Sequence, residues 1–143
     1  MAGFTMSEWI SRSPRDVFDF VTSPGNATKV APSVRSMVQI SDGPVGVGTR
    51  YRETRTMRGK DQQAELEVVA FEPPQDYAIK NLTEGIETVY RYAFRPEANG
   101  TRAELVCDVT ASGAKKLMLP LVAAVLKKED GDHLKRVKKL LET

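Results

Sequence analysis

The chain has 143 residues, of which 41% are hydrophobic and 28% are charged, and its formal net charge is +2. These values are typical of a folded globular protein, expected here as a single domain over residues 1–143, and they exclude a disordered or membrane-embedded chain. Because the chain is nearly neutral, its charge argues against nucleic acid as a partner.

The first expected elements are a strand over residues 4–12 and a short helix that begins after Ser13. Ser13 can cap this helix, Pro14 fits its first position, and Asp16 places an acid in its first turn. Turn residues at 23–26 end the helix, so we expect one or two short helices before the second strand.

A second strand is expected over residues 34–40, and a stretch with three glycines follows it at 42–48. Glycines bind a dinucleotide phosphate when they connect a strand to the N-terminus of a helix. Residues 49–57 are instead rich in β-branched and aromatic side chains and show no apolar stripe at helical spacing. They predict a third strand, which argues against a phosphate-binding loop.

The middle of the chain is expected to be an antiparallel meander. Turn residues occur at 58–61, 73–76, 83–85 and 99–100. The intervals between these turns are too short for helices that would cross between parallel strands. From Lys115 onward, apolar residues recur at helical spacing, which predicts one long amphipathic helix with a bend at Gly131.

This order of elements predicts an α+β fold in which a seven-stranded, curved antiparallel sheet wraps round the long C-terminal helix. That helix is the element long enough to cover the apolar face of the sheet. Where a strongly bent sheet surrounds a single helix, the two surfaces do not touch everywhere. A cavity lined by apolar and aromatic groups is therefore expected between them.

Four stretches in this order carry a resemblance to a known superfamily: residues 10–18, 46–51, 71–74 and 134–142. Through them the whole chain resembles the helix-grip (SRPBCC, START-like) superfamily of START domains, polyketide cyclases and aromatases, and pollen-allergen-like proteins. The resemblance implies the helix-grip fold, with a cavity rather than a filled core between sheet and helix. It also implies that Gly46 and Gly48 connect the second and third strands, where glycine takes a positive φ without steric cost.

Period-two alternation divides each strand into an inward and an outward face, and a shift of one residue would exchange the two. On the sixth strand we expect the aromatic face to point inward: Thr88, Tyr90, Tyr92 and Phe94. Alternation also predicts that the following residues point inward: Ala103, Leu105, Cys107 and Val109 on the last strand, Tyr77 and Ile79 on the fifth, and Ala64, Leu66, Val68 and Ala70 on the fourth. From the terminal helix, Leu121, Val122 and Val125 are expected to cover the cavity.

The third strand offers the candidate polar groups. If Tyr51 points inward, Glu53 and Arg55 do too. An unpaired buried charge is strongly unfavourable, so these two would pair with each other, with tyrosines or with a ligand. Arg55 would then hold a carboxylate or phenolate while Glu53 acts as an acid or base. In the alternative register both charged side chains face water.

Catalytic constellations are otherwise sparse. His133, the single histidine, lies in a charged stretch and has no second histidine or cysteine placed to share a metal, so we interpret it as a surface residue. Asp130 and Asp132 lack the spacing of a calcium loop. We therefore expect neither a metal nor a cofactor.

The single cysteine indicates the compartment. Cys107 cannot form an internal disulfide, and its apolar neighbours predict a buried strand residue in a protein of a reducing compartment. The sequence shows neither an export signal nor about 18 consecutive apolar residues, so we expect a cytoplasmic protein without a membrane span.

Three functions remain open, and we favour the first. It is the binding, and transport, of a small hydrophobic or amphipathic ligand such as a lipid, an isoprenoid quinone or a polyketide. The second is an enzyme of the polyketide cyclase or aromatase type that uses Glu53, Arg55 or Tyr92 to transfer protons. The third is a protein-interaction module that docks through the basic residues of the C-terminal helix: Lys135, Arg136, Lys138 and Lys139.

The candidate ligand contacts follow from the inward faces. They are Tyr51, Glu53, Arg55, Leu66, Val68, Tyr77, Ile79, Tyr90, Tyr92, Phe94, Leu105, Cys107, Leu121, Val122 and Val125. Burial against the apolar members supplies most of the affinity, while the polar members orient the ligand. The sequence is compatible with either a monomer or a homodimer.

Overall fold

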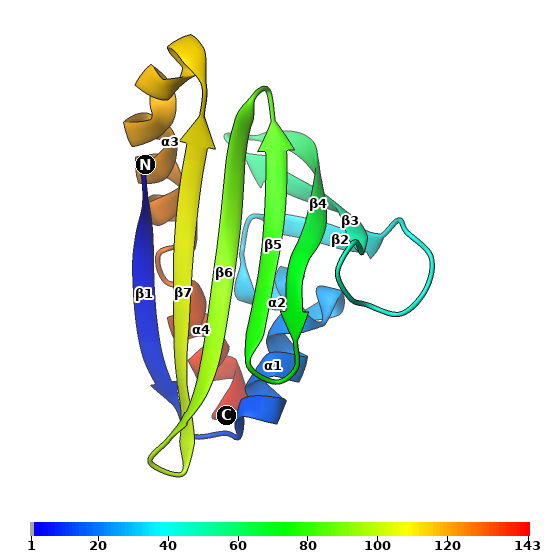
Figure 1. Ribbon diagram of the computed structural model, residues 1–143, viewed down its shortest axis with the longest axis vertical. Coiled ribbons are helices and arrows are strands. Elements are labelled where there is room, and N and C mark those ends of the chain that lie inside the picture. Colours follow the sequence, from blue (N-terminus) through cyan, green and yellow to red (C-terminus); the bar gives the residue numbers. More distant parts are fainter. Residues whose placement is uncertain (1) are drawn as a thin grey trace.

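The computed structural model describes residues 2–143, and Figure 1 shows their arrangement. Met1, which belongs to the domain expected over residues 1–143, lies outside the described residues. The elements in chain order are β1 Ala2–Ile10, α1 Pro14–Thr22, the 3-10 helix η1 Pro24–Asn26, α2 Ala27–Val30, β2 Val34–Gln39, β3 Arg50–Met57, β4 Lys60–Glu72, β5 Asp76–Thr83, β6 Ile86–Glu97, β7 Gly100–Ala111, the 3-10 helix η2 Gly113–Met118, α3 Leu119–Asp130 and α4 His133–Leu141.

The strands form one seven-stranded sheet in the order β1-β7-β6-β5-β4-β3-β2, and every neighbouring pair is antiparallel. In Figure 1, β4 to β7 run lengthwise, β2 and β3 cross behind them, and the helices lie on that same side. The sheet therefore curves round the helices. The predicted α+β helix-grip architecture, with short helices after the first strand, is confirmed.

The helix α1 begins where the capping signals predict. Ser13 Oγ accepts a hydrogen bond of 3.1 Å from the backbone N of Asp16, and Pro14 occupies the first turn, where its missing N–H costs nothing. The predicted turn at 23–26 ends α1, and the short helix α2 follows it. These two helices cover one end of the sheet in Figure 1.

An aromatic cluster of Phe18, Phe71, Tyr77 and Phe94 fills the space between α1 and the sheet. Phe18 is 1% exposed and meets the other three rings edge to face, at centroid distances of 5.4, 6.4 and 5.9 Å. Aromatic pairs of this geometry contribute about 0.5–1.5 kcal/mol each beyond their burial. This end of the sheet is therefore densely packed.

A bulge in β4 corrects one of the predicted faces. The pairing register with β5 shifts between Val68 and Ala70, after which Phe71 pairs with Tyr77 and packs into the aromatic cluster. Ala70 pairs with Ala78 and takes the outward face. The expectation that Ala70 points inward is wrong because a bulge inserts one residue and reverses the alternation beyond it.

The C-terminal helical region bends at Gly131, as expected, and the bend separates α3 from α4. The backbone N of Gly131 donates a hydrogen bond of 2.7 Å to Lys127 O, and a Cβ on Gly131 would collide with that same oxygen. Glycine is therefore required for the close approach of these backbones. The bend leaves Asp130 at the end of α3 and His133 at the start of α4.

The glycine-rich stretch connects β2 to β3, as the sequence predicts. Gly48 has a φ of +93°, a conformation that glycine adopts without strain, and Gly43 has the same φ. Gly46 instead contributes its backbone N, which donates a hydrogen bond of 2.9 Å to Thr49 Oγ1. The loop leads into a strand, so it lacks the helix N-terminus of a phosphate-binding loop.

The basic end of the last helix is partly engaged in holding the fold together. Lys138 Nζ donates hydrogen bonds to the backbone O of Trp9 over 2.6 Å and to Glu142 Oε2 over 3.0 Å. The carboxylate of Glu142 also accepts a hydrogen bond of 2.9 Å from the backbone N of Ser11. These contacts tie α4 to the end of β1 and give part of the basic stretch a structural role.

Candidate functional site

A cavity of about 400 Å³ lies between the inner face of the sheet and the helices. Its walls come from α1 and α2, from strands β2 to β6, and from α3 and α4. Its exposed lining residues are Gln62, Gln63, Thr83 and Glu84. They stand beside the β3–β4 and β5–β6 turns, which places the cavity mouth at the end of the sheet opposite the aromatic cluster.

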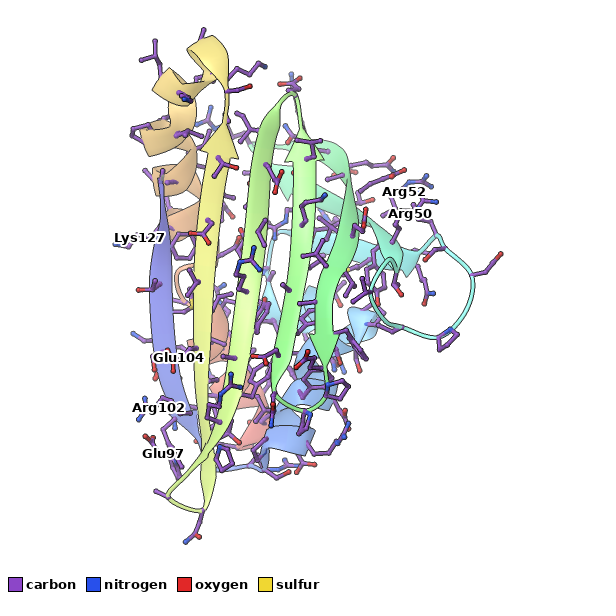
Figure 2. All side chains as sticks on the ribbon, in the orientation of Figure 1. Arg50, Arg52, Glu97, Arg102, Glu104 and Lys127 are labelled. Carbon is purple, nitrogen blue, oxygen red and sulfur yellow. The ribbon has the colours of Figure 1, made fainter. Side chains whose placement is uncertain are left out.

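More than half of the candidate ligand contacts line this cavity. They are Glu53, Arg55, Leu66, Tyr77, Ile79, Tyr90, Tyr92 and Val122. On β3, Arg50 and Arg52 are exposed, and Figure 2 shows their side chains together on the outer side of the sheet. The strand therefore turns Glu53 and Arg55 inward, and the alternative register with both in water does not occur.

Five other candidates are packed into the core behind the cavity wall: Tyr51, Val68, Phe94, Leu105 and Cys107. None of the five is more than 1% exposed. They point inward, as the alternation predicts, but neighbouring side chains cover them, so they do not reach the cavity. The thiol of Cys107 is a buried small hydrophobe, and burial raises its pKa to about 11.

The terminal helix presents one of its three candidates to the cavity. Val122 lines it, together with Leu126 one turn later. Leu121 is 64% exposed and points to solvent, and Val125 borders a separate, smaller hollow. The expectation that Leu121 and Val125 cover the cavity is wrong, because the inward stripe of α3 passes through Val122 and Leu126 instead.

A polar cluster of Glu53, Arg55, Tyr90 and Asp130 lies inside the cavity. Arg55 Nε donates to Glu53 Oε1 over 2.8 Å, and Arg55 Nη1 lies 3.5 Å from Asp130 Oδ1. Tyr90 Oη donates to the other oxygen, Asp130 Oδ2, over 2.7 Å. The exposed fractions of these side chains are 19% for Arg55, 13% for Glu53 and 4% for Asp130. The charges are therefore largely removed from water, and each is compensated by an opposite charge nearby.

Two residues of the cavity lining were not predicted from the sequence, which placed His133 at the surface and gave Asp130 no role. Both line the cavity, and Asp130 is 3% exposed. His133 Nε2 lies 3.2 Å from Tyr92 Oη, which joins α4 to β6 across the cavity. The surface assignment of His133 is wrong because Asp130 and His133 continue the inward stripe that Val122 starts and Val137 ends.

Burial and neighbouring charges set the protonation of these groups. Burial lowers the pKa of His133 to about 4, against a smaller opposite effect of Asp130, so the imidazole is neutral at pH 7. Burial would lower the pKa of Arg55 too, but Asp130 and Glu53 outweigh it and raise that pKa. The pKa of Tyr90 is raised mainly by burial and secondly by the charge of Asp130. The pKa of Tyr92 is raised mainly by burial and secondly by Tyr77. Both phenols therefore stay protonated at neutral pH.

One buried hydroxyl in the wall region has no partner. Tyr51 is 0% exposed, and its Oη makes no hydrogen bond with any residue of the described range 2–143. Burial raises its pKa, so the phenol stays protonated. An unsatisfied buried hydroxyl is costly, so this group lowers the stability of the fold.

Over residues 2–143, no group of three or more His, Cys, Asp or Glu side chains is arranged to hold a metal ion. In the same range, no helix has the combination of length and apolar composition that a bilayer crossing demands. The ionisable side chains that line the cavity are carboxylates, a guanidinium, phenols and one imidazole.

The fold is shared with solved structures of low sequence identity. Ara h 8.0201 is similar with a TM-score of 0.79 and 16% identity, over 98% of this chain and 97% of that one. TTHA0849 from Thermus thermophilus has a TM-score of 0.74 and 17% identity, over 94% and 93%. The di-domain ARO/CYC protein BexL from the BE-7585A biosynthetic pathway has a TM-score of 0.80 and 15% identity.

The alignment with BexL covers 99% of this chain and 47% of BexL, so the chain spans about half of that di-domain protein. No curated protein matches the chain in sequence. A family sequence profile, described as "Polyketide cyclase / dehydrase and lipid transport", matches residues 1–142. The match extends over essentially the whole chain.

Proposed function

Because the chain belongs to the polyketide cyclase / dehydrase and lipid transport family, we propose that it binds a small hydrophobic or amphipathic ligand in the cavity. The observation that carries this proposal is the cavity of about 400 Å³ between sheet and helices. Small-molecule sites in proteins occupy roughly 300–1,000 Å³ and combine apolar walls with a few fixed polar groups. This cavity has both properties.

The lining supports a division of tasks between its apolar and polar members. Leu66, Ile79 and Val122 come from two strands and a helix and offer apolar surface on opposite walls. Burial of ligand surface there supplies about 25 cal/mol per Å², which is the larger part of the affinity. The hydroxyl groups of Tyr90 and Tyr92, which also line the cavity, orient the polar end of the ligand.

The mouth supports a role in carrying a ligand as well as holding it. It opens beside exposed turns, so a ligand of lipid or polyketide type enters without unfolding of the sheet. We place this activity in the cytoplasm, because the single cysteine, Cys107, is a buried free thiol that suits a reducing compartment.

The first test is native mass spectrometry of freshly purified protein, which should detect a co-purifying small molecule. The second uses N-phenylnaphthylamine, an uncharged dye that fluoresces in apolar surroundings. Ala64→Trp places a large side chain in the cavity lining and should abolish the dye signal. Val47→Trp, at a loop position that is 69% exposed, should leave it unchanged.

If the dye does not bind, or if it binds equally well to the protein with Ala64→Trp, the cavity is not a ligand site. A folded state of both variants, checked by circular dichroism, is needed for this comparison. Loss of dye binding in the Val47→Trp protein alone would also contradict the proposal, since that residue lies outside the lining.

A second candidate function is a cyclase-type reaction, favoured by the contact between Tyr92 Oη and His133 Nε2 at 3.2 Å. The neutral imidazole can accept a proton from carbon next to a carbonyl of a poly-β-keto chain, while the Tyr92 hydroxyl donates a hydrogen bond to the enolate oxygen that forms. Glu53, with its carboxylate in the same cavity, is a further base.

The test is turnover of a poly-β-keto thioester by the wild-type protein and two variants. Tyr92→Phe and His133→Gln should lose turnover by at least a hundredfold while they still bind the uncharged dye, since one positioned acid or base contributes about a hundredfold or more. A wild-type protein that binds the substrate and never converts it would leave binding as the function.

A further inference from the structure

The lining of the cavity carries more negative than positive charge. Glu53 and Asp130 lie inside, Glu84 stands at the exposed rim, and Arg55 is the one Lys or Arg side chain among the lining residues that the structure describes. The imidazole of His133 adds no charge at neutral pH, because burial keeps its pKa low. The cavity interior thus holds two carboxylates against one guanidinium.

The charge of Arg55 is already compensated by the protein. Its Nε contacts Glu53 Oε1 at 2.8 Å and its Nη1 lies 3.5 Å from Asp130 Oδ1. A ligand carboxylate at this guanidinium would be the third anion around one cation. In a partly desolvated site the repulsion between these anions is stronger than in water. The expectation that Arg55 holds a carboxylate or phenolate is therefore poorly supported by its surroundings.

The carboxylates of Glu53 and Asp130 differ in whether an oxygen remains free to accept a hydrogen bond. Both oxygens of Asp130 are engaged, one near Arg55 and one as the acceptor of the Tyr90 hydroxyl. Glu53 uses Oε1 for Arg55, and its Oε2 accepts no hydrogen bond from any residue between 2 and 143. The Glu53 side chain is only 13% exposed and lines the cavity, so this open acceptor belongs to the cavity lining.

We propose that the cavity selects amphipathic ligands whose polar group is an amine or a hydroxyl, and that it discriminates against fatty acids and other carboxylates. Glu53 Oε2 accepts the hydrogen bond from that polar group. A cationic amine also supplies the positive charge that the polar cluster lacks. This inference rests on the proposed binding function, and it specifies the chemical class of the ligand.

The test compares three amphiphiles with the same chain and different head groups: dodecylamine, dodecanol and dodecanoate. Each displaces N-phenylnaphthylamine from the wild-type protein at pH 7, below its critical micelle concentration. We expect dodecylamine and dodecanol to displace the dye at concentrations at least tenfold lower than dodecanoate. Dodecanoate with equal or better potency overturns the inference and leaves ligand binding intact.

A pair of variants assigns the effect to Glu53. Glu53→Gln keeps the shape and removes one negative charge, so it should reduce the advantage of dodecylamine over dodecanoate by at least fivefold. Glu65→Gln removes an exposed carboxylate outside the cavity lining and should leave the order of the three amphiphiles unchanged. An unchanged order in the folded Glu53→Gln protein contradicts the role of Glu53.

The failures of the two proposals are distinguishable. If the dye and all three amphiphiles fail to bind, the ligand-binding function itself is wrong and the inference falls with it. If the dye binds and the acid is preferred, only the head-group selectivity is wrong. Should Glu53→Gln fold poorly, the comparison of the three amphiphiles on the wild-type protein decides the matter alone.

Discussion

Tyr90 Oη donates a hydrogen bond of 2.7 Å to Asp130 Oδ2, and this bond joins the middle of β6 to the last residue of α3. Asp130 is 3% exposed, and its second oxygen lies near Arg55. A strand that forms one wall of the cavity is thus connected to the opposite wall by a buried carboxylate. The connection predicts a strong dependence of stability on Asp130.

Replacement of Asp130 by alanine should destabilise the protein by about 3–5 kcal/mol, because it breaks a buried ion pair and leaves its partners desolvated. Tyr90→Phe should cost less, about 1–3 kcal/mol, since it leaves one oxygen of Asp130 unsatisfied. Urea unfolding of both single variants and the double variant measures these effects. If the two losses simply add, the hydrogen bond does not couple the residues.

The unpartnered hydroxyl of Tyr51 predicts a substitution that stabilises the protein. Tyr51→Phe removes a buried polar group that makes no hydrogen bond within residues 2–143. We expect a gain of about 1 kcal/mol, seen as a higher thermal midpoint, because an unsatisfied buried group carries a desolvation penalty of that order. Tyr90→Phe serves as the matched comparison, since its hydroxyl is satisfied. A loss of stability in the Tyr51→Phe protein would mean that the hydroxyl has a partner in solution.

The lowered pKa of His133 predicts a pH-dependent loss of stability. Burial shifts this pKa from its ordinary value of 6.5 to about 4, so between these values the unfolded chain binds a proton that the folded chain does not. Stability should therefore fall as the pH decreases from about 6.5 to about 4, by at most about 3 kcal/mol. Chemical denaturation across this range measures the fall.

Asp and Glu side chains in general have pKa values of about 4, so His133→Gln is the necessary control. The difference in unfolding free energy between the wild-type protein and this variant isolates the histidine. We expect the difference to change steadily between pH 6.5 and pH 4 and to level off below. A difference that is independent of pH would show that His133 is not held neutral by the fold.

The bend between α3 and α4 predicts that substitution of Gly131 by any residue with a Cβ atom destabilises the protein. A Cβ there would collide with the backbone O of Lys127, so Gly131→Ala should cost about 1–3 kcal/mol, as overpacking does. It should also weaken binding of the uncharged dye, because the bend positions Asp130 and His133. Gly46→Ala is the control, since a Cβ at Gly46 meets nothing within 4 Å. Equal stability of the two variants would contradict the role of the bend.

Local sequence patterns predicted most of the fold because each of them corresponds to one kind of local structure. The cap at Ser13, the turns between strands, and the alternation that buries Tyr92 and Phe94 all depend on neighbouring residues. The bulge at Val68 and Ala70 was not predictable in this way. No glycine or proline marks it, and the shift becomes visible only through the pairing of Phe71 with Tyr77.

Period-two alternation predicts on which face of the sheet a side chain lies, but it does not predict how deeply that side chain is buried. Leu105 and Leu66 both point inward, yet Leu105 is 0% exposed in the core and Leu66 borders the cavity. The difference depends on the curvature of the whole sheet. This is why the sequence identified the general lining of the cavity but mixed core residues with it.

The helical residues Asp130 and His133 were missed for another reason. A charged stretch normally indicates a helix face that is exposed to solvent, and this rule led to the wrong prediction here. The stretch contains an inward stripe whose members are separated by four, four, three and four residues: Val122, Leu126, Asp130, His133 and Val137. Polar residues inside such a stripe are a signal of function, because burial of a polar group is costly without a specific partner.

The position of the aromatic cluster distinguishes an interlocked end of the sheet from an end that borders the cavity. Rings around Phe18 interlock, so a change in any of them disturbs its neighbours. Residues toward the opposite end border the cavity, where a change in side-chain size or polarity disturbs fewer packed neighbours. The packing around Phe18 therefore fixes the backbone, while substitutions in the cavity lining change the size and polarity of the cavity.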